Sequence, residues 1–239
     1  GAFTVDSAIF MQRIAPSPDG VDNLRAEGYA EDQIHLVGNV MIDSLFANLE
    51  RARATDSLAR YGVAAGGYGV VTLHRPSNVD DPDTLRSLLG ALGRVAAGLP
   101  LVWPVHPRTA ARLVAAGVPD GLRPVPPAGY LDFIALQAGA RLVLTDSGGI
   151  QEETTALGVP CLTLRENTER PITVEEGTNR VVGVRPDDIV AAAKDVLADP
   201  PPKRSPALWD GKAGERIADA LLAHLAAGER YRPTDRRPI

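Results

Sequence analysis

The stretch LTDSGGIQEE, residues 144–153, joins an apolar run to two carboxylates through a serine and two glycines. An apolar run that stops at a glycine turn predicts a buried strand, and Ile150 then opens a helix. Glycines let backbone N–H groups come close to a ligand, and the N-terminus of a helix carries partial positive charge. The stretch therefore predicts a strand–turn–helix unit of an α/β fold, with an anion site at its turn.

A plainer interpretation of the same residues is a tight turn in which Asp146 or Ser147 caps the helix and the glycines serve backbone geometry alone. The stretch lacks the GxGxxG pattern of dinucleotide-binding folds and the lysine of a P-loop. Glu152 and Glu153 lie at the start of the helix, where a carboxylate is favourable, and one of them can accept hydrogen bonds from a ribose diol. The residues alone leave both interpretations open.

The composition limits which classes of protein the chain can belong to. The chain has 239 residues, of which 44% are apolar and 23% are charged, as in an ordinary soluble globular protein. A net charge of −5 argues against a nucleic-acid partner, and no apolar run is long enough to span a membrane. Cys161 is the single cysteine, which excludes an internal disulfide and suits a reducing, cytoplasmic location.

Apolar strands and amphipathic helical stretches alternate along the chain. Short continuous apolar strands between helices indicate a parallel sheet covered on both faces, so the predicted fold is α/β, a Rossmann-like doubly wound parallel sheet. The expected strands are residues 34–37, 68–73, 101–104, 122–125, 141–145, 160–164 and 180–182. The expected helices are residues 40–60, 81–97, 109–116, 130–138, 149–157, 187–197 and 212–227.

Polar residues follow several of these strands, where ligands of an open parallel sheet bind. His74 and Arg75 follow one strand, His106 follows the next, and Arg170 lies in the polar loop after a later one. Each histidine is either an acid/base or phosphate-binding group or a structural residue. Arg170 either clamps a phosphate or forms a surface salt bridge. No histidine pair has the spacing of a helical metal site, so we expect no metal.

The motifs and their order resemble those of a known family. They are PSPDGVDNLRAEG, VGNVMIDSL, VTLHRPSN, PVHPRT, YLDFIALQ, LTDSGGIQEE, LGVPCLTLRENTERP, VEEGTNRVVG and DGKAGERI. From about residue 15 to about residue 222 the sequence resembles the non-hydrolysing UDP-N-acetylglucosamine 2-epimerases of bacteria. DSGGIQEE followed by TERP is the most specific part of this resemblance.

The resemblance implies a fold and a reaction. The fold is the C-terminal domain of a GT-B arrangement, in which two Rossmann-like domains lie side by side and the C-terminal one holds most of the UDP. The reaction converts UDP-GlcNAc to UDP-ManNAc by elimination of UDP, through a 2-acetamidoglucal, followed by re-addition with inversion at C2. The resemblance further implies no cofactor, a homodimer, and a role in cell-wall polysaccharide biosynthesis.

The resemblance also implies roles for individual residues. His74 matches the catalytic histidine near the diphosphate, and Glu153 matches the carboxylate on the ribose hydroxyls. The remaining matches are Ser147, Gly148 and Gly149 as the diphosphate cradle, Arg170 facing the UDP phosphates, Phe133 reading uracil through its backbone, and Arg75 and His106 near an allosteric UDP-GlcNAc site.

Two departures from the family pattern affect these expectations. The common HRREN motif reads His74-Arg75-Pro76-Ser77-Asn78 here, which leaves allosteric control open. The family also begins with a further Rossmann-like domain, which carries the acidic residues that move the C2 proton, and no stretch here matches it. We therefore expect the C-terminal half, with residues 1–14 as a junction, 15–200 as the UDP-binding domain, 207–228 as a terminal helix and 229–239 as a tail.

Two other functions stay open from the sequence. One is an inactive module that binds UDP or a nucleotide sugar, and the other is a GT-B glycosyltransferase with a similar glycine-rich site. The TERP and HRPSN motifs favour the epimerase family over the transferase.

Overall fold

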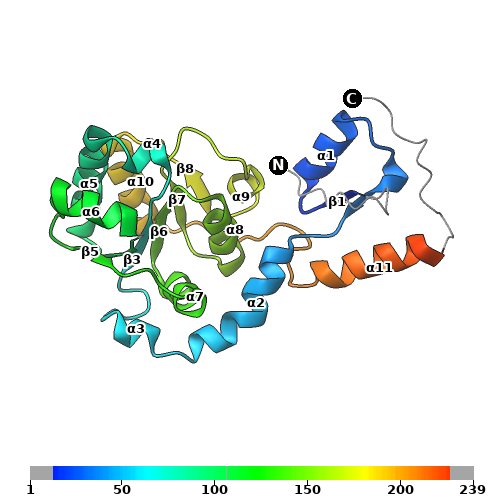
Figure 1. Cartoon of the computed structure of the whole chain (residues 1–239), viewed down its shortest axis with the longest axis horizontal. Coiled ribbons are helices and arrows are strands. Elements are labelled where there is room, and N and C mark those ends of the chain that lie inside the picture. Colours follow the sequence, from blue (N-terminus) through cyan, green and yellow to red (C-terminus); the bar gives the residue numbers. More distant parts are fainter. Residues whose placement is uncertain (1–12, 106, 227–239) are drawn as a thin grey trace. The chain divides into compact units, whose positions relative to one another are not determined.

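The computed structural model describes residues 13–105 and 107–226, except for the side chains of Pro107 and Arg108. It divides into two compact units. The α/β unit comprises residues 45–205, and the terminal unit combines residues 1–44 with residues 206–239. Each unit is described by itself below, and Figure 1 labels most of their helices and strands.

The α/β unit is built on a six-stranded parallel sheet with the strand order β5-β4-β3-β6-β7-β8. Its strands are β3 (Gly69–Thr72), β4 (Leu101–Pro104), β5 (Leu122–Val125), β6 (Leu142–Thr145), β7 (Cys161–Thr163) and β8 (Asn179–Val181). The chain adds β4 and β5 on one side of β3, then returns to add β6 on the other side. This is the Rossmann order, and it confirms the predicted fold class.

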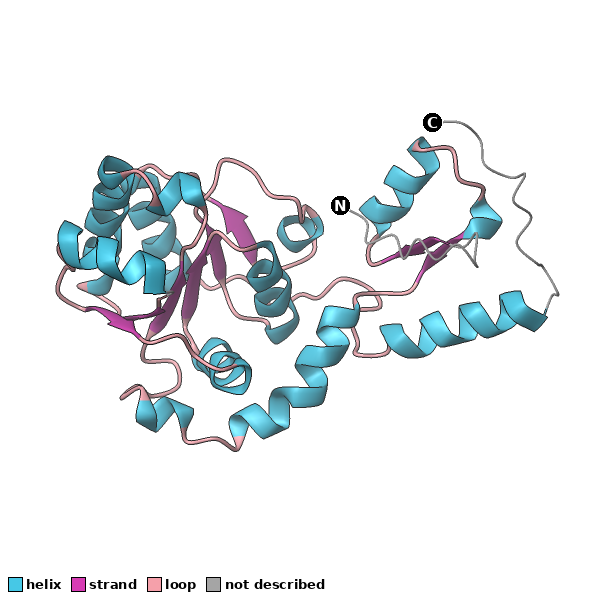
Figure 2. Ribbon diagram, in the orientation of Figure 1, coloured by secondary structure: helices cyan, strands magenta, loops and turns pink. Residues whose placement is uncertain are grey.

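Helices cover both faces of this sheet, as Figure 2 shows. The core on one face includes side chains of α5 (Pro82–Ala96), α6 (Pro107–Ala116) and α10 (Pro186–Ala198), and the core on the other includes α3 (Ser57–Arg60), α7 (Tyr130–Gly139) and α8 (Gly148–Leu157). The short helices α4 (Pro76–Val79) and α9 (Ile172–Glu175) complete the unit. Among the described helices, none combines the length and the apolar run needed to cross a membrane.

The expected single helix over residues 40–60 is wrong, because two helices occupy that stretch. Helix α2 (Val40–Arg53) ends before residue 54, and α3 begins at Ser57. Between them the Thr55 hydroxyl donates to the Ala52 carbonyl at 2.7 Å and lies 2.5 Å from the Ser57 hydroxyl. Hydroxyl side chains that bond nearby backbone compete with helix hydrogen bonds, so the apolar periodicity alone does not predict this break.

The terminal unit contains a pair of parallel strands, β1 (Arg13–Ala15) and β2 (Ile34–Leu36). They are joined through α1 (Pro18–Ala26) and a short 3₁₀ turn (Glu31–Gln33). Helix α11 (Ala213–Ala226) begins on the carboxylate of Asp43, which accepts the Ala213 and Gly214 N–H groups at 3.1 and 2.7 Å. This cap explains why distant stretches of the chain, VGNVMIDSL and DGKAGERI, form one unit.

Gly38 is a site where the terminal unit requires glycine. Its φ is +88°, and an added Cβ would lie 2.1 Å from the Leu208 carbonyl oxygen. We expect Gly38→Ala to destabilise this unit by more than about 2 kcal/mol, because backbone strain and a backbone clash add. Hydrogen exchange of peptides covering residues 34–42 and 206–216 measures the loss.

Gly28→Ala is the matched control for that substitution. Gly28 has a φ of +89°, but nothing lies within 4 Å of its added Cβ. We therefore expect it to cost about 1 kcal/mol, the left-handed backbone penalty alone. Equal protection loss in the two variants would contradict the close approach of Leu208 to Gly38.

Candidate functional site

The candidate site lies where the strand order of the α/β unit reverses, between β3 and β6. These strands are neighbours in register, with Thr72 opposite Thr145. Their carboxyl ends therefore carry His74 and Asp146 to the same edge of the sheet. Open α/β sheets bind ligands in the crevice at this topological switch point.

The carboxylate of Asp146 is the centre of this edge. It is fully buried, yet four donors surround it. The backbone N–H groups of His74 and Arg75 donate to it at 3.0 and 2.9 Å, and the Asn78 side-chain amide donates at 3.1 Å. The Nδ1 atom of His74 lies 2.9 Å from Asp146 Oδ1. A buried carboxylate with this many donors fixes the loop that follows β3.

His74 presents one ring nitrogen to Asp146 and keeps the other available to a ligand. Its side chain is 56% exposed, whereas Asp146 is 0% exposed. The hydrogen bond with Asp146 raises the pKa of His74, and the partial burial and the charge of Arg75 oppose that rise. Since Nδ1 faces the carboxylate, Nε2 is the nitrogen that can donate to an anion at this edge.

Helix α8 begins at this edge without a side-chain cap. Ser147 is its N-cap residue, and the Ser147 hydroxyl makes no capping hydrogen bond. The Ser147 N–H instead donates to the Thr145 hydroxyl at 3.0 Å. The N–H groups of the first turn, at Gly148, Gly149 and Ile150, therefore point out of the helix end with no capping acceptor from Ser147, as in anion sites.

The backbone conformation at position 148 does not require glycine. Its φ lies outside the left-handed region, and an added Cβ would meet only ordinary contacts, 3.8 Å from Arg170 Cγ and 3.9 Å from Glu169 Oε2. Neither strain nor crowding within the protein explains a glycine here. This favours the interpretation in which the turn leaves space for a ligand, rather than the plainer interpretation of glycine for geometry alone.

Arg170 lies beside this turn and carries a buried donor. Its Nε atom is 2.9 Å from Glu152 Oε1, and both side chains are largely buried. The Nη1 group of Arg170 also donates to the Glu169 carbonyl at 3.1 Å. The surface salt bridge that the sequence left open as an alternative involves exposed carboxylates, whereas this ion pair is with a carboxylate of α8. Arg170 is therefore anchored to the helix whose N-terminus forms the turn.

A second basic group faces the same loop. Glu169 accepts two hydrogen bonds from Arg165, at 2.6 and 2.8 Å, and Arg75 Nη2 lies 3.5 Å from Glu169 Oε1. The Arg165 guanidinium lowers the pKa of Glu169 to about 2. The Nε–H of Arg75 is buried and has no partner among the described residues. Two arginines, Arg75 and Arg170, thus bring guanidinium groups to this edge, and each is paired with a carboxylate of the protein.

Glu153 lies one turn further along α8, in contact with α7. It is buried, and Gln137 Nε2 donates to its Oε2 at 2.6 Å. Burial raises the pKa of Glu153, and the hydrogen bond from Gln137 partly opposes that shift. Burial, and then the charge of Glu153, also raise the pKa of Tyr130. One carboxylate oxygen is thus held by Gln137, which leaves the other for a polar ligand group.

The remaining predicted site residues are less informative. Phe133 packs against the core on the α7 side of the sheet, and its N–H donates to the Gly129 carbonyl at 2.8 Å within the first turn of α7. Its contact with uracil stays a prediction. His106 lies outside the described residues.

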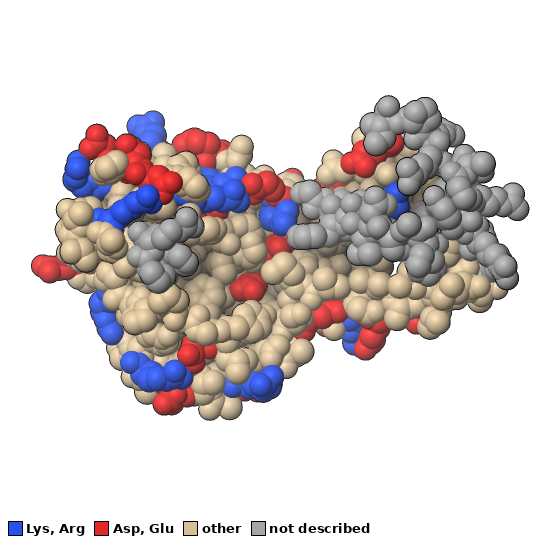
Figure 3. All heavy atoms as spheres, viewed as in Figure 1, with Lys and Arg blue, Asp and Glu red and all other residues tan. Residues whose placement is uncertain are grey.

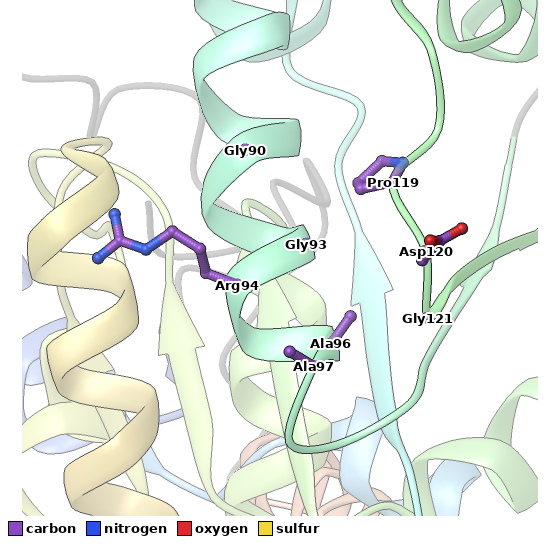
Figure 4. Close-up of a pocket in the computed structure, with 8 residues that line it drawn as sticks. All are labelled: Gly90, Gly93, Arg94, Ala96, Ala97, Pro119, Asp120 and Gly121. Carbon is purple, nitrogen blue, oxygen red and sulfur yellow. The ribbon is translucent and has the colours of Figure 1, made fainter.

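The α/β unit also has a hollow at the end of the sheet opposite to the candidate site, where the strands begin. Its volume is about 620 Å³, and Figure 4 shows its residues: Gly90, Gly93, Arg94, Ala96, Ala97, Pro119, Asp120 and Gly121. The Gly121 carbonyl accepts from the N–H of Leu101, the first residue of β4. The hollow therefore lies at the amino ends of the strands, away from the candidate site.

The charges of the surface do not indicate a nucleic-acid interface. On the face of the α/β unit drawn in Figure 3, basic and acidic side chains are interspersed. Proteins that bind a phosphate backbone usually carry a continuous basic patch. The positive character of the candidate site is local, and carboxylates pair with its cations.

Sequence reasoning missed several residues of the site. The sequence offers Asp146 only as a possible helix cap and Glu169 only as a possible partner of Arg170, and it assigns no role to Asn78, Gln137 or Arg165. The signal for Asp146 was its position directly after an apolar strand, which needed only the adjacency of β3 and β6 to bring it to His74. Gln137 had a weaker signal, as a polar residue in the apolar run IALQAG.

The chain is similar in sequence to a family of known proteins. The family model described as UDP-N-acetylglucosamine 2-epimerase matches residues 7–222. The UDP-N-acetylglucosamine 2-epimerase of Methanocaldococcus jannaschii is 36% identical over 218 residues, which cover 87% of this chain and 59% of that protein. The UDP-2,3-diacetamido-2,3-dideoxy-D-glucuronate 2-epimerase of Pseudomonas aeruginosa is also 36% identical, over 209 residues that cover 86% of this chain and 58% of that protein.

A solved structure shows the same similarity. The crystal structure of the Methanocaldococcus jannaschii UDP-GlcNAc 2-epimerase in complex with UDP-GlcNAc and UDP has a TM-score of 0.78 and 34% identity to this chain. The match covers 89% of this chain and 61% of that one. The chain thus spans less than two thirds of the length of the relatives it matches.

Glu153 provides a pH-dependent test of the site. Because burial raises its pKa, the folded state binds this proton more tightly than the unfolded chain does. Its contribution to stability is therefore largest below the ordinary value of 4.5 and is lost as the pH rises through the raised value. As the pH rises from about 5 to about 8, we expect the free energy of unfolding of Glu153→Gln to fall by less than that of the parent protein.

Urea unfolding at the two pH values measures this difference. Glu176→Gln, which neutralises an exposed glutamate after α9, is the matched control and should follow the parent protein. The same pH dependence in the parent and in Glu153→Gln would contradict a buried, destabilised carboxylate at Glu153.

Proposed function

The chain belongs to the UDP-N-acetylglucosamine 2-epimerase family, and on that basis we propose that it binds the UDP part of a UDP-N-acetylated sugar and acts in epimerisation of that sugar at C2. In this proposal the diphosphate lies over the first turn of α8, at Ser147, Gly148 and Gly149. The ribose hydroxyls donate to Glu153, and the uracil lies against α7 near Phe133. The two cations beside the diphosphate are His74 and Arg170.

One observation carries the placement of the diphosphate. Gly148 has an ordinary backbone and enough room for a side chain, yet the position holds glycine at an uncapped helix N-terminus. A phosphate that must approach the backbone N–H groups explains this choice. His74, which contacts Asp146, and Arg170, whose Cγ would lie 3.8 Å from a Cβ at Gly148, supply the positive charge that a diphosphate needs.

The proposed chemistry places these residues at the leaving group. In the elimination, the C1–O bond to UDP breaks, its electron pair stays on the diphosphate oxygen, and the C2 proton goes to a base. Donors aimed at the diphosphate lower the energy of that charge as it develops. We assign His74 and Arg170 to this role, with Ser147 adding a hydroxyl donor. We propose no metal and no nicotinamide for it, and a homodimer as the assembly.

A second candidate concerns the sugar rather than the reaction. The Pseudomonas aeruginosa relative, named for a UDP-2,3-diacetamido-2,3-dideoxy-D-glucuronate, is as similar in sequence as the relative named for UDP-N-acetylglucosamine. The two substrates share UDP and an acetamido group at C2, where the reaction occurs. We therefore propose UDP-N-acetylglucosamine as the first substrate to test and the diacetamido uronate as the second.

The proposal is tested by calorimetric titration of the 239-residue chain with UDP, followed by an NMR assay of each UDP sugar. We expect UDP to bind at least about a hundredfold more tightly than uridine, because the diphosphate contacts are charge-assisted. Appearance of the C2 epimer would establish activity in this chain. UDP binding without the epimer would favour the nucleotide-binding module, and no preference for UDP over uridine would contradict the proposed site.

Gly148→Ala separates binding from stability. Because the added methyl group meets only ordinary contacts and alanine favours helices, we expect the free energy of unfolding to stay the same or rise slightly. We expect UDP affinity to fall by about tenfold or more, since the methyl group holds the phosphate off the backbone donors. Calorimetry and urea unfolding of the same preparation measure both quantities.

Gly90→Ala is the matched control for Gly148→Ala. Gly90, like Gly148, lies in a helix. Nothing lies within 4 Å of a Cβ added at Gly90, and the residue lines the hollow at the amino ends of the strands. It should leave UDP affinity unchanged. Unchanged affinity in Gly148→Ala as well would remove the first turn of α8 from the diphosphate site.

A further inference from the structure

Three residues of the HRPSN segment, 74–78, contact the carboxylate of Asp146. His74 contacts it through Nδ1 and through its backbone N–H, Arg75 through its backbone N–H, and Asn78 through its side-chain amide. These are the three positions that match the family's HRREN motif. Among the described residues, no hydrogen bond joins Asp146 to Pro76 or Ser77, the two positions that depart from it.

The Asn78 amide extends this cluster to a third strand. It is almost fully buried and donates both to Asp146 Oδ2 and to the Leu164 carbonyl, each at 3.1 Å. Leu164 directly follows β7, so the cluster links the carboxyl ends of β3, β6 and β7. The cluster thus ties the loop after β3 to the ends of the two neighbouring strands.

We propose that Asp146 is a positioning residue of the site, which holds His74 as an imidazolium with its Nε2–H directed at the diphosphate. This inference rests on the proposed function. It adds a role for a residue that does not itself contact the nucleotide. Asp146 also accepts from the backbone N–H groups of His74 and Arg75, so His74 is held both at its backbone and at its Nδ1 atom.

The charges around His74 support a protonated ring. Asp146 faces it from the end of β6 and raises its pKa, and Arg75, on the adjacent residue, lowers it by a smaller effect. From the loop after β7, Glu169 lies against Arg75, and Arg165 pairs with Glu169. The hydrogen bond with Asp146 is the largest influence on the pKa of His74, and partial burial, which lowers that pKa, is the next.

An imidazolium suits this position because the leaving diphosphate gains negative charge. His74 can donate its Nε2–H without giving up the proton, so its role needs no proton transfer. An asparagine at position 146 would fill the same space and still bond to Asn78, but it would not stabilise a charged ring. The Asp146→Asn variant therefore separates the charge of the carboxylate from its shape.

The first experiment is an NMR titration of the His74 ring, assigned by comparison with His74→Gln. In the parent protein we expect the His74 midpoint to lie above the ordinary value of 6.5, with Nδ1 and Nε2 both protonated below that midpoint. In Asp146→Asn we expect the midpoint to fall to a lower pH, whereas in Ser77→Ala it should not move. Ser77 is exposed and lies on α4 between Arg75 and Asn78, so it controls for changes in the same segment.

The second experiment follows UDP affinity from about pH 7 to about pH 9, where the phosphates of UDP are already ionised. A raised pKa means that the charged ring is present at low pH and is lost as the pH rises. We expect the affinity of the parent protein to fall over this range. Asp146→Asn should bind UDP about fivefold or more weakly near pH 7 and lose most of this pH dependence.

The outcomes decide between a positioning role and a merely structural one. Weaker binding by Asp146→Asn with an unchanged His74 midpoint and pH dependence would overturn the proposal. If the variant does not fold, the parent protein still decides, because a His74 midpoint at or below 6.5 would overturn it. If the parent does not bind UDP, the proposed function fails, and with it the direction of Nε2–H toward a diphosphate, whereas the NMR midpoint still tests the action of Asp146 on His74.

Discussion

The buried carboxylate of Asp146 and the four donors that surround it hold the functional edge of the sheet together. A carboxylate that is buried away from solvent requires hydrogen-bond donors, and the loop after β3 provides them. The fold makes this possible because the strand order reverses between β3 and β6. His74 and the glycine turn therefore meet at the carboxyl ends of β3 and β6, where open α/β sheets bind ligands.

The other charges of the site are paired in a related way. Glu152 holds Arg170 against α8, and Glu169 draws Arg165 and Arg75 together. Ion pairs of this kind orient guanidinium groups before an anion arrives, which reduces the entropy lost on binding. Glu153 shows the cost of such a site, because its burial opposes its charge and raises its pKa. In our proposal Glu153 serves binding rather than stability.

Local patterns in the sequence predicted β2 to β8, most of the longer helices and the residues that follow the strands, but not β1 or the helices α1, α4 and α9. They did not predict the neighbours of each strand, since sheet pairing joins residues far apart in the chain. The partners of Asp146 in the HRPSN segment are 68 to 72 residues away from it, so its role was hidden although its position was not. The break between α2 and α3 was missed for the opposite reason, because the Thr55 hydroxyl acts over three residues against an unbroken apolar pattern.

The most direct test of the account follows the backbone amides of the α8 turn by NMR as UDP is added, with uridine as the comparison. The account predicts large shifts of the Gly148, Gly149 and Ile150 N–H signals with UDP and small shifts with uridine, because the diphosphate accepts from these groups. Saturable UDP binding that leaves these three signals in place would contradict it. In that case the nucleotide binds elsewhere, and the space at Gly148 has another cause.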